Sequence, residues 1–189
     1  YYRGFKKSLC TSLNHVVCHG IPSEDRILEE GDAVNVDVTA IINDHYGDTS
    51  RMFCIGKPSV KLDNLINATY DSMMSAIKIL KPGIKLGDIG HTIQSHVEEQ
   101  GFSVVRDFCG HGIGTSFHEP PNILHYGNKN TGMPVKTGMT FTIEPMINAG
   151  KYSVKMLNDG WTAVTKDKSL SAQFEHTVGI TENGLSLIH

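Results

Sequence analysis

Five side chains that can bind a metal ion lie in five separate short segments, each predicted to be a strand or the end of a strand. They are Asp37, Asp48, His111, Glu144 and Glu175. If a fold brought the four carboxylates together without cations, each pair about 4 Å apart would repel by about 4 kcal/mol at an effective dielectric constant near 20. Two divalent cations would balance their charge. The set therefore predicts a dinuclear metal centre.

The composition excludes several other classes of protein. A chain of 189 residues suits one domain that needs no disulfide staple. The net charge is -3 and the basic residues are scattered, so nucleic acid is not an expected partner. Apolar stretches are far shorter than the roughly 20 residues of a membrane helix. The four cysteines form no CxxC pair and indicate reduced thiols in a cytoplasm.

Apolar periodicity predicts an α+β fold with antiparallel strands and helices on one face. One helix is expected from the Ser59 N-cap to the stop at residues 81–83, and a second from Asp88 to Gln100. The expected strands are residues 9–17, 33–42, 51–55, 102–105, 110–114, 139–147, 152–157, 162–164 and 173–181.

Asp37 and Asp48 lie on the two arms of a predicted hairpin. Direct pairing of the two would place the turn near Ile42 and Asn43, whereas a turn over residues 43–47 requires a bulge to realign them. Asp37 could occupy a solvated strand face and Asp48 an ordinary turn. Because a carboxylate among valines is unfavourable to bury unless it is paired, their spacing favours a shared metal or ion-pair role.

The two histidines of GHGIG and FHEPP differ in their surroundings. Glycines flank His111 and permit close backbone approach or positive φ, and the prolines after Glu119 favour extended chain at His118. Neither lies in an HExxH helix, so zincin chemistry is not predicted. The glycines could also hold phosphate, although no GKS/T or GxGxxG pattern is present.

Glu144 and Glu175, taken alone, could be ordinary solvated strand residues. As part of the set they supply the carboxylates that two hard or borderline ions require, with one histidine nitrogen. His19, at a strand end before a Gly/Pro turn, is either a turn histidine or a hydrogen-bonding group in the site. Cys10 has no histidine partner pattern typical of a nucleophile. The aromatic residues are core or pocket wall, with Phe117 and Trp161 the better pocket candidates.

Taken in order, the segments VCHGIP, NVDVT, GDTSRMF, GHGIG, FHEPP, FTIEPM, DGWTAVT and QFEHT resemble the motifs of bacterial type I methionine aminopeptidases, in the M24 peptidase family. The resemblance spans nearly the whole chain. It implies a pita-bread fold with two pseudo-symmetric halves around a dinuclear site, and removal of the initiator methionine from nascent proteins. The short stretch between His118 and Glu144 has no room for the helical insert of type II enzymes.

The resemblance also assigns roles to individual residues. It implies that the five residues named first are the metal ligands, with Asp48 and Glu175 bridging two ions of cobalt, manganese, iron or zinc. Glu144 would accept a proton from the attacking water, and His19 and His118 would contact the scissile amide and carbonyl. The methionine side-chain pocket would be formed by Tyr2, Phe5, Cys10, Phe117 and Trp161. Lys6 departs from the proline that is common there.

From the resemblance we expect a single catalytic domain over residues 1–189 that lacks the usual N-terminal helical segment and a short C-terminal tail. The expected partners are nascent polypeptide N-termini at the ribosome, and the expected form is a cytoplasmic monomer without nucleic acid or membrane contacts. Two alternatives stay open: an aminopeptidase P or prolidase of the same fold, and a non-catalytic pita-bread binding protein.

Overall fold

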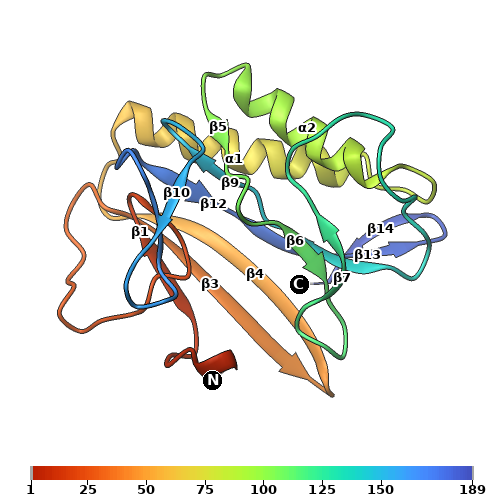
Figure 1. The fold of residues 1–189 in the computed structure, drawn as a ribbon, viewed down its shortest axis with the longest axis horizontal. Helices are drawn as coiled ribbons and strands as arrows, with labels where there is room; N and C mark the ends of the chain where they lie inside the picture. The colour runs from red at the N-terminus through yellow and green to blue at the C-terminus, as the bar shows by residue number, and fades with distance from the viewer. Residues whose placement is uncertain (1, 189) are drawn as a thin grey trace.

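The computed structural model describes residues 2–188 and contains antiparallel strands with two helices along one side (Figure 1). This confirms the expected α+β class. The helices are α1 (Val60–Lys78) and α2 (Leu86–Glu98), and a single 3-10 turn covers Tyr2–Gly4. The strands of this part of the chain are β1 (Cys10–Leu13), β2 (Val16–Cys18), β3 (Ala33–Ile42), β4 (His45–Cys54), β5 (Ser103–Val104), β6 (Gly110–Gly112), β7 (Glu119–Ile123), β8 (Thr140–Ile143), β9 (Met146–Asn148), β10 (Val154–Met156), β11 (Ala163–Thr165), β12 (Ser171–Gln173), β13 (Glu175–Thr181) and β14 (Gly184–Leu187).

The main sheet joins strands from both ends of the chain. Its order is β1-β3-β4-β13-β8-β6-β7, with β14 also paired to β13. Two smaller sheets have the orders β10-β11-β2 and β12-β9-β5. The central contact is the antiparallel pairing of β4 with β13, where Ser50 lies opposite Glu175. Four neighbouring strands, β4, β13, β8 and β6, therefore carry residues that are far apart in the sequence.

The long β3–β4 hairpin turns at Asn43 and Asp44, whose φ angles are 49° and 62°. Two residues with positive φ are the geometry that a two-residue hairpin loop prefers. The register pairs Asp37 with Ser50 and Thr39 with Asp48. The two aspartates are thus diagonal neighbours on one face, so both predicted arrangements, direct pairing and a bulge, are wrong. The return strand also begins earlier than residue 51.

Three of the predicted strands are interrupted. The segment 9–17 is broken at Asn14, whose φ is 55°, the segment 139–147 at Glu144 and Pro145, and the segment 173–181 at Phe174. Proline has no N–H to donate to a ladder, which explains the second break. The strands β7 and β14 were not predicted.

The helix starts follow from their capping groups. Helix α1 begins after Ser59, as predicted, because the Ser59 hydroxyl accepts a hydrogen bond from Leu62 N at 3.2 Å. Helix α2 begins at Leu86, earlier than predicted. There the Asp88 carboxylate accepts from Lys85 N at 2.9 Å, so Asp88 lies inside the first turn and does not precede the helix.

One end of the inner face of the β3–β4 hairpin packs in the apolar core, and the rest of this face lines a cavity. At its open end, Ala33 and Met52 belong to the apolar core with helix residues such as Leu65. Further along the same face, Asp37 and Asp48 line a cavity. The polar site is therefore continuous with a close-packed core that holds its backbone in place.

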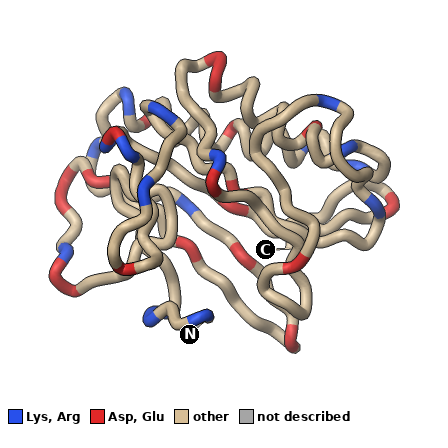
Figure 2. Tube along the Cα trace, in the orientation of Figure 1, with Lys and Arg blue, Asp and Glu red and all other residues tan. Residues whose placement is uncertain are grey.

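Charged residues are spread over many elements (Figure 2), in agreement with the scattered basic residues of the sequence. Neither helix in the described part of the chain is long and apolar enough to cross a membrane.

Truncation inside the helical layer should destabilise the fold. Leu65 of α1 is fully buried, whereas Val60 of the same helix is 79% exposed. We expect Leu65→Ala to lower the free energy of unfolding by about 2–5 kcal/mol and Val60→Ala to change it by less than about 0.5 kcal/mol. Urea denaturation of both variants measures this, and equal losses would contradict the packing described.

Candidate metal centre and substrate cavity

A cavity of about 580 Å³ lies among strands β1, β3, β4, β6 and β13 and the aromatic residues near the start of the chain. Its size is typical of a site for a small ligand. All twelve site residues predicted from the sequence line it. They are Tyr2, Phe5, Cys10, His19, Asp37, Asp48, His111, Phe117, His118, Glu144, Trp161 and Glu175.

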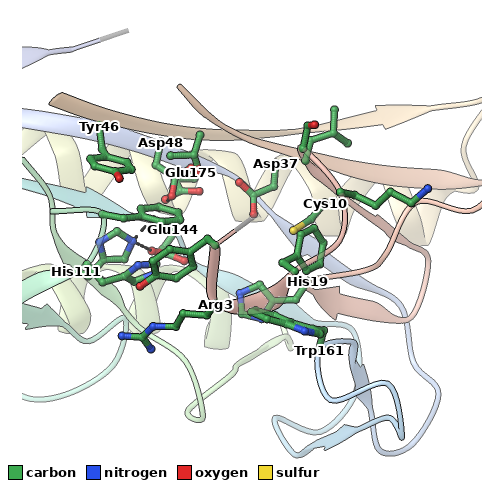
Figure 3. A pocket seen from close by; sticks show the side chains of 18 of the residues that line it. Arg3, Cys10, His19, Asp37, Tyr46, Asp48, His111, Glu144, Trp161 and Glu175 are labelled. Atoms are coloured by element: carbon green, nitrogen blue, oxygen red, sulfur yellow. Dashed lines mark hydrogen bonds and ion pairs between the residues drawn. The ribbon is translucent and has the colours of Figure 1, made fainter. Parts of the chain in front are cut away.

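The five candidate ligands come from neighbouring strands and point toward one another (Figure 3). His111 Nε2 lies 3.9 Å from Asp48 Oδ2 and 3.7 Å from Glu144 Oε1. Asp48, His111 and Glu175 each offer a ligand atom within 4.8 Å of the others. Asp37 is the diagonal neighbour of Asp48 on the same face of the hairpin. The cluster thus has the spacing and donor types of a cation site.

The orientation of His111 suits metal binding. Its Nδ1 lies 2.9 Å from the carbonyl oxygen of Gly112, which can only accept, so Nδ1 carries the proton. This leaves Nε2 as a lone-pair donor directed at the carboxylates, as in most histidine ligands of metals. The backbone N–H of His111 donates to Thr142 Oγ1 at 3.0 Å, which fixes the strand beneath the ring.

The flanking glycines allow β6 to approach its neighbours closely. A side chain at position 110 would collide with the carbonyl oxygen of Thr142, and one at position 112 with that of Pro120. Neither glycine has a positive φ. The close approach is therefore to neighbouring strands, whereas the sequence pattern predicted an approach to a ligand, and the predicted positive φ is wrong.

Hydrogen bonds satisfy only part of the carboxylate cluster. Asp48 accepts from Thr39 Oγ1 at 2.9 Å, and Glu144 accepts from Thr142 Oγ1 at 2.8 Å and from Gln173 Nε2 at 3.5 Å. Among the described residues, the buried Glu175 Oε1 has no hydrogen-bond donor. A buried oxygen without a donor is costly. A cation would satisfy it.

Burial raises the pKa of every carboxyl group in the cluster, and repulsion from neighbouring carboxylates raises those of Asp37, Glu144 and Glu175 further. Burial, followed by the charge of Asp48, raises the pKa of Asp37 to about 8, and burial raises that of Asp48 to about 6. The pKa values of Glu144 and Glu175 lie well above their usual range, with burial the largest cause. Four oxygen-donor groups and one neutral nitrogen match the preferences of hard and borderline divalent cations. The residues present fit such a metal.

His118 and His19 occupy the same cavity without being hydrogen-bonded to the cluster. The ring of His118 lies 4.0 Å from that of His111, centroid to centroid. Burial, then the proximity of His111, Arg3 and His19, lowers the pKa of His118 to about 4. Burial also lowers the pKa of His19. Both rings are therefore neutral at pH 7 and can donate one hydrogen bond.

The end of β2 places His19 at a sharp turn. Its φ is 57°, and a side chain at Gly20 would collide with the Thr11 carbonyl oxygen. The ring of His19 packs edge-on against Trp161 at 6.2 Å and Phe108 at 5.5 Å. The turn is thus what directs this ring into the cavity.

Aromatic rings form the rest of the wall. Phe117 stacks on Tyr46 at 5.5 Å and meets Tyr2 edge-on at 4.7 Å, and Phe5 meets Trp161 edge-on at 5.1 Å. Cys10 lines the same cavity and is paired with Asp37 in the β1–β3 register. Burial, followed by the charges of Asp37 and Asp48, raises its pKa to about 12. Such a thiol stays protonated, which disfavours the nucleophilic role.

Sequence reasoning missed other residues of the site. Thr39, Tyr46 and Gln173 line the cavity, and each stands two positions from a predicted ligand. Period-two alternation, which puts such residues on one face of a strand, could have found them. His125 was also missed. Its Nε2 accepts the backbone N–H of Glu144 at 3.1 Å, and burial lowers its pKa to about 3.

Comparisons with known proteins agree with this geometry. The family model "Metallopeptidase family M24" matches residues 1–182. The methionine aminopeptidase of Rickettsia prowazekii is 57% identical over 98% of this chain and 72% of its own, and that of Escherichia coli K12 is 53% identical over 99% and 71%. The crystal structure of the Rickettsia enzyme superposes with a TM-score of 0.96, covering 98% of this chain and 75% of its own.

A more distant structure shares the same architecture. The prolidase of Pyrococcus furiosus, 26% identical, superposes with a TM-score of 0.76 over 96% of this chain and 48% of its own. The curled antiparallel sheet with its outer helices is the pita-bread fold, here carrying the carboxylate site of a metal-dependent hydrolase. The chain belongs to metallopeptidase family M24.

The raised carboxyl pKa values predict how the metal-free protein responds to pH. A carboxyl whose pKa is higher in the fold than in the unfolded chain makes the fold less stable as the pH rises through the folded value. With Asp37 at about 8, we expect this residue alone to remove about 1 kcal/mol of unfolding free energy from the chelator-treated protein between pH 7 and pH 9. The raised pKa values of Glu144, Glu175 and Cys10 should add to this loss. The buried histidines have lowered pKa values and do not titrate in that window.

Denaturant melts at the two pH values measure this difference, and Asp37→Asn is the control. The variant should lose less stability over the same interval, because the amide does not ionise. A steeper loss in Asp37→Asn than in the parent chain would contradict the assignment.

Proposed function

We propose that this protein is a methionine aminopeptidase that removes the initiator methionine from nascent proteins. The observation that carries the proposal is one cavity in which an aromatic wall adjoins a cluster of four carboxylates and a histidine nitrogen. The family match and the names of the relatives support the same activity.

Asp37, Asp48, His111, Glu144 and Glu175 would hold two divalent cations, with Asp48 and Glu175 shared between them. Two divalent ions would balance the four negative charges of the carboxylates. A cation would also satisfy Glu175 Oε1, which receives no hydrogen bond from the described residues. When bound, such ions lower the pKa of a water, polarise the scissile carbonyl and anchor a free α-amino group. Cobalt, manganese, iron and zinc all suit this mixture of oxygen and nitrogen donors.

The protein's own groups move the protons. Glu144 accepts the proton of the attacking water, and Thr142 Oγ1 holds one oxygen of that carboxylate. The neutral His118 donates to the oxygen that develops negative charge in the transition state. His19, directed inward by its turn, hydrogen-bonds to the scissile amide.

Tyr2, Phe5, Cys10, Phe117 and Trp161 form the pocket for the methionine side chain. Aromatic rings and a protonated thiol give an apolar environment. The thioether of methionine is flexible and makes favourable sulfur–aromatic contacts. We propose that the protein's partners are the N-termini of polypeptides near the ribosome. We also propose that the enzyme is a monomer in the cytoplasm.

Peptide hydrolysis tests the activity. We expect release of methionine from Met-Ala-Ser, loss of that activity after chelation, and its recovery on adding divalent cations. Assaying Xaa-Pro peptides in parallel distinguishes this activity from that of a prolidase, which would cleave them preferentially. Preferential cleavage of Xaa-Pro peptides, or no cleavage of either substrate with any of the four metals, would reject the proposal.

Mutation should separate the roles of the two neighbouring histidines. His111→Ala should lose metal affinity and activity together. His118→Ala should keep its metal, because His118 is assigned to the transition state, and should lower kcat by about 10²–10³. Steady-state kinetics paired with metal titration tests this, and the parent chain should titrate to two ions. Loss of metal by His118→Ala would show that its assigned role is wrong.

A further inference from the structure

Glu144 lies at a break between two strands, β8 and β9. Its peptide is therefore outside the ladders that pair β8 with β13 and β9 with β12. Without another acceptor, the buried N–H of Glu144 would be unsatisfied, which native structures avoid. His125 supplies the acceptor: its Nε2 lies 3.1 Å from Glu144 N.

The hydrogen bond defines the state of the His125 ring. An N–H can only donate, so Nε2 must be unprotonated, and a neutral imidazole with a free Nε2 carries its proton on Nδ1. His125 is 1% exposed, which favours the neutral ring. This tautomer is the same as that of His111, whose Nε2 lies 3.7 Å from the Glu144 carboxylate.

Helix α2 holds the segment that carries His125. A side chain at Gly90 would collide with the carbonyl oxygens of Leu124 and Tyr126, the two neighbours of His125. The Gln94 side chain also accepts from Gly127 N at 3.0 Å. Because α2 contacts the backbone on both sides of His125, the packing of the helix on the sheet fixes the position of the imidazole.

We propose that His125 is a positioning residue that sets the direction of the Glu144 carboxylate through the Glu144 backbone. Thr142 fixes one carboxylate oxygen directly, Pro145 limits the backbone after Glu144, and His125 limits the backbone before it. The inference rests on the proposed function, in which Glu144 accepts the proton of the attacking water. His125 does not line the cavity, and its hydrogen bond is to the Glu144 backbone.

Nitrogen-15 NMR of the histidine rings tests the tautomer in the parent protein without substrate. We expect the Nε2 of His125 to resonate as an unprotonated nitrogen at pH 7, and His125→Gln identifies the signal by its disappearance. A protonated Nε2 at that pH would overturn the proposal. Because this measurement involves no turnover, an enzyme inactive on Met-Ala-Ser with the expected tautomer would reject the function and leave the hydrogen bond standing.

Kinetics at saturating divalent metal tests the consequence. The leucine of His125→Leu has a side chain of similar size but no hydrogen-bond acceptor. We expect kcat on Met-Ala-Ser to fall about 10- to 100-fold in this variant, with KM changed by less than about threefold. His125→Gln retains an acceptor near the Nε2 position and should recover most of kcat. The control is His96→Leu, the same change at a partly buried histidine of α2 away from the cavity, which should leave kcat unchanged.

Two results would overturn the positioning role: a kcat of His125→Leu equal to that of the parent chain, or equal losses in His125→Leu and His125→Gln. If His125→Leu does not fold, the Gln variant and the NMR spectrum decide between the same alternatives.

Discussion

Repulsion among four buried carboxylates is the constraint around which this structure is organised. Each of the four loses hydration on folding, and the charges of neighbouring carboxylates raise the pKa values of Asp37, Glu144 and Glu175 further. Hydroxyl and amide donors compensate for only part of this loss, since Glu175 Oε1 has no donor among the described residues. The fold therefore holds a strained electrostatic arrangement that divalent cations would relieve.

The geometry of the pleated strand supplies the compensating donors. Thr39 lies opposite Asp48 across the hairpin and donates to it, and Thr142 lies two residues before Glu144 and donates to it. Side chains with this relation share a face of the sheet. For these two of the four carboxylates, a threonine on the same strand or the paired strand therefore compensates locally for repulsion that arises from long-range assembly.

Much of this could be predicted from the sequence, because burial of an acidic residue among valines leaves a clear signal. Asp37 was recognised in this way, Asp48 was recognised by its spacing from Asp37, and the motif resemblance brought in the aromatic wall. Neither predicted position of the turn was right, because a run of turn-forming residues conceals which two of them take positive φ. The breaks at Asn14 and Phe174 were missed for a similar reason, since alternation continues across them.

His125 escaped prediction for a different physical reason. Its partner is a backbone N–H, and every residue type except proline has one, so no pattern of side chains reveals the pairing. The glycine at position 90 is likewise informative only once the helix is seen against the chain at residues 124–126. Contacts between backbone groups of distant segments are fixed by packing and leave little trace in the periodicity of one sequence.

The pairing of β4 with β13 has a consequence for the order in which this molecule is built. Asp48 N donates to Thr177 Oγ1 across a sequence separation of 129 residues, and such non-local contacts form slowly because a long loop must first be closed. The hairpin and the two helices can form from local contacts, but Glu175 reaches the cluster only when its strand joins the sheet. Capture of cations is therefore among the last events of folding. A ribosome making this chain carries an incomplete metal site until Glu175 has emerged.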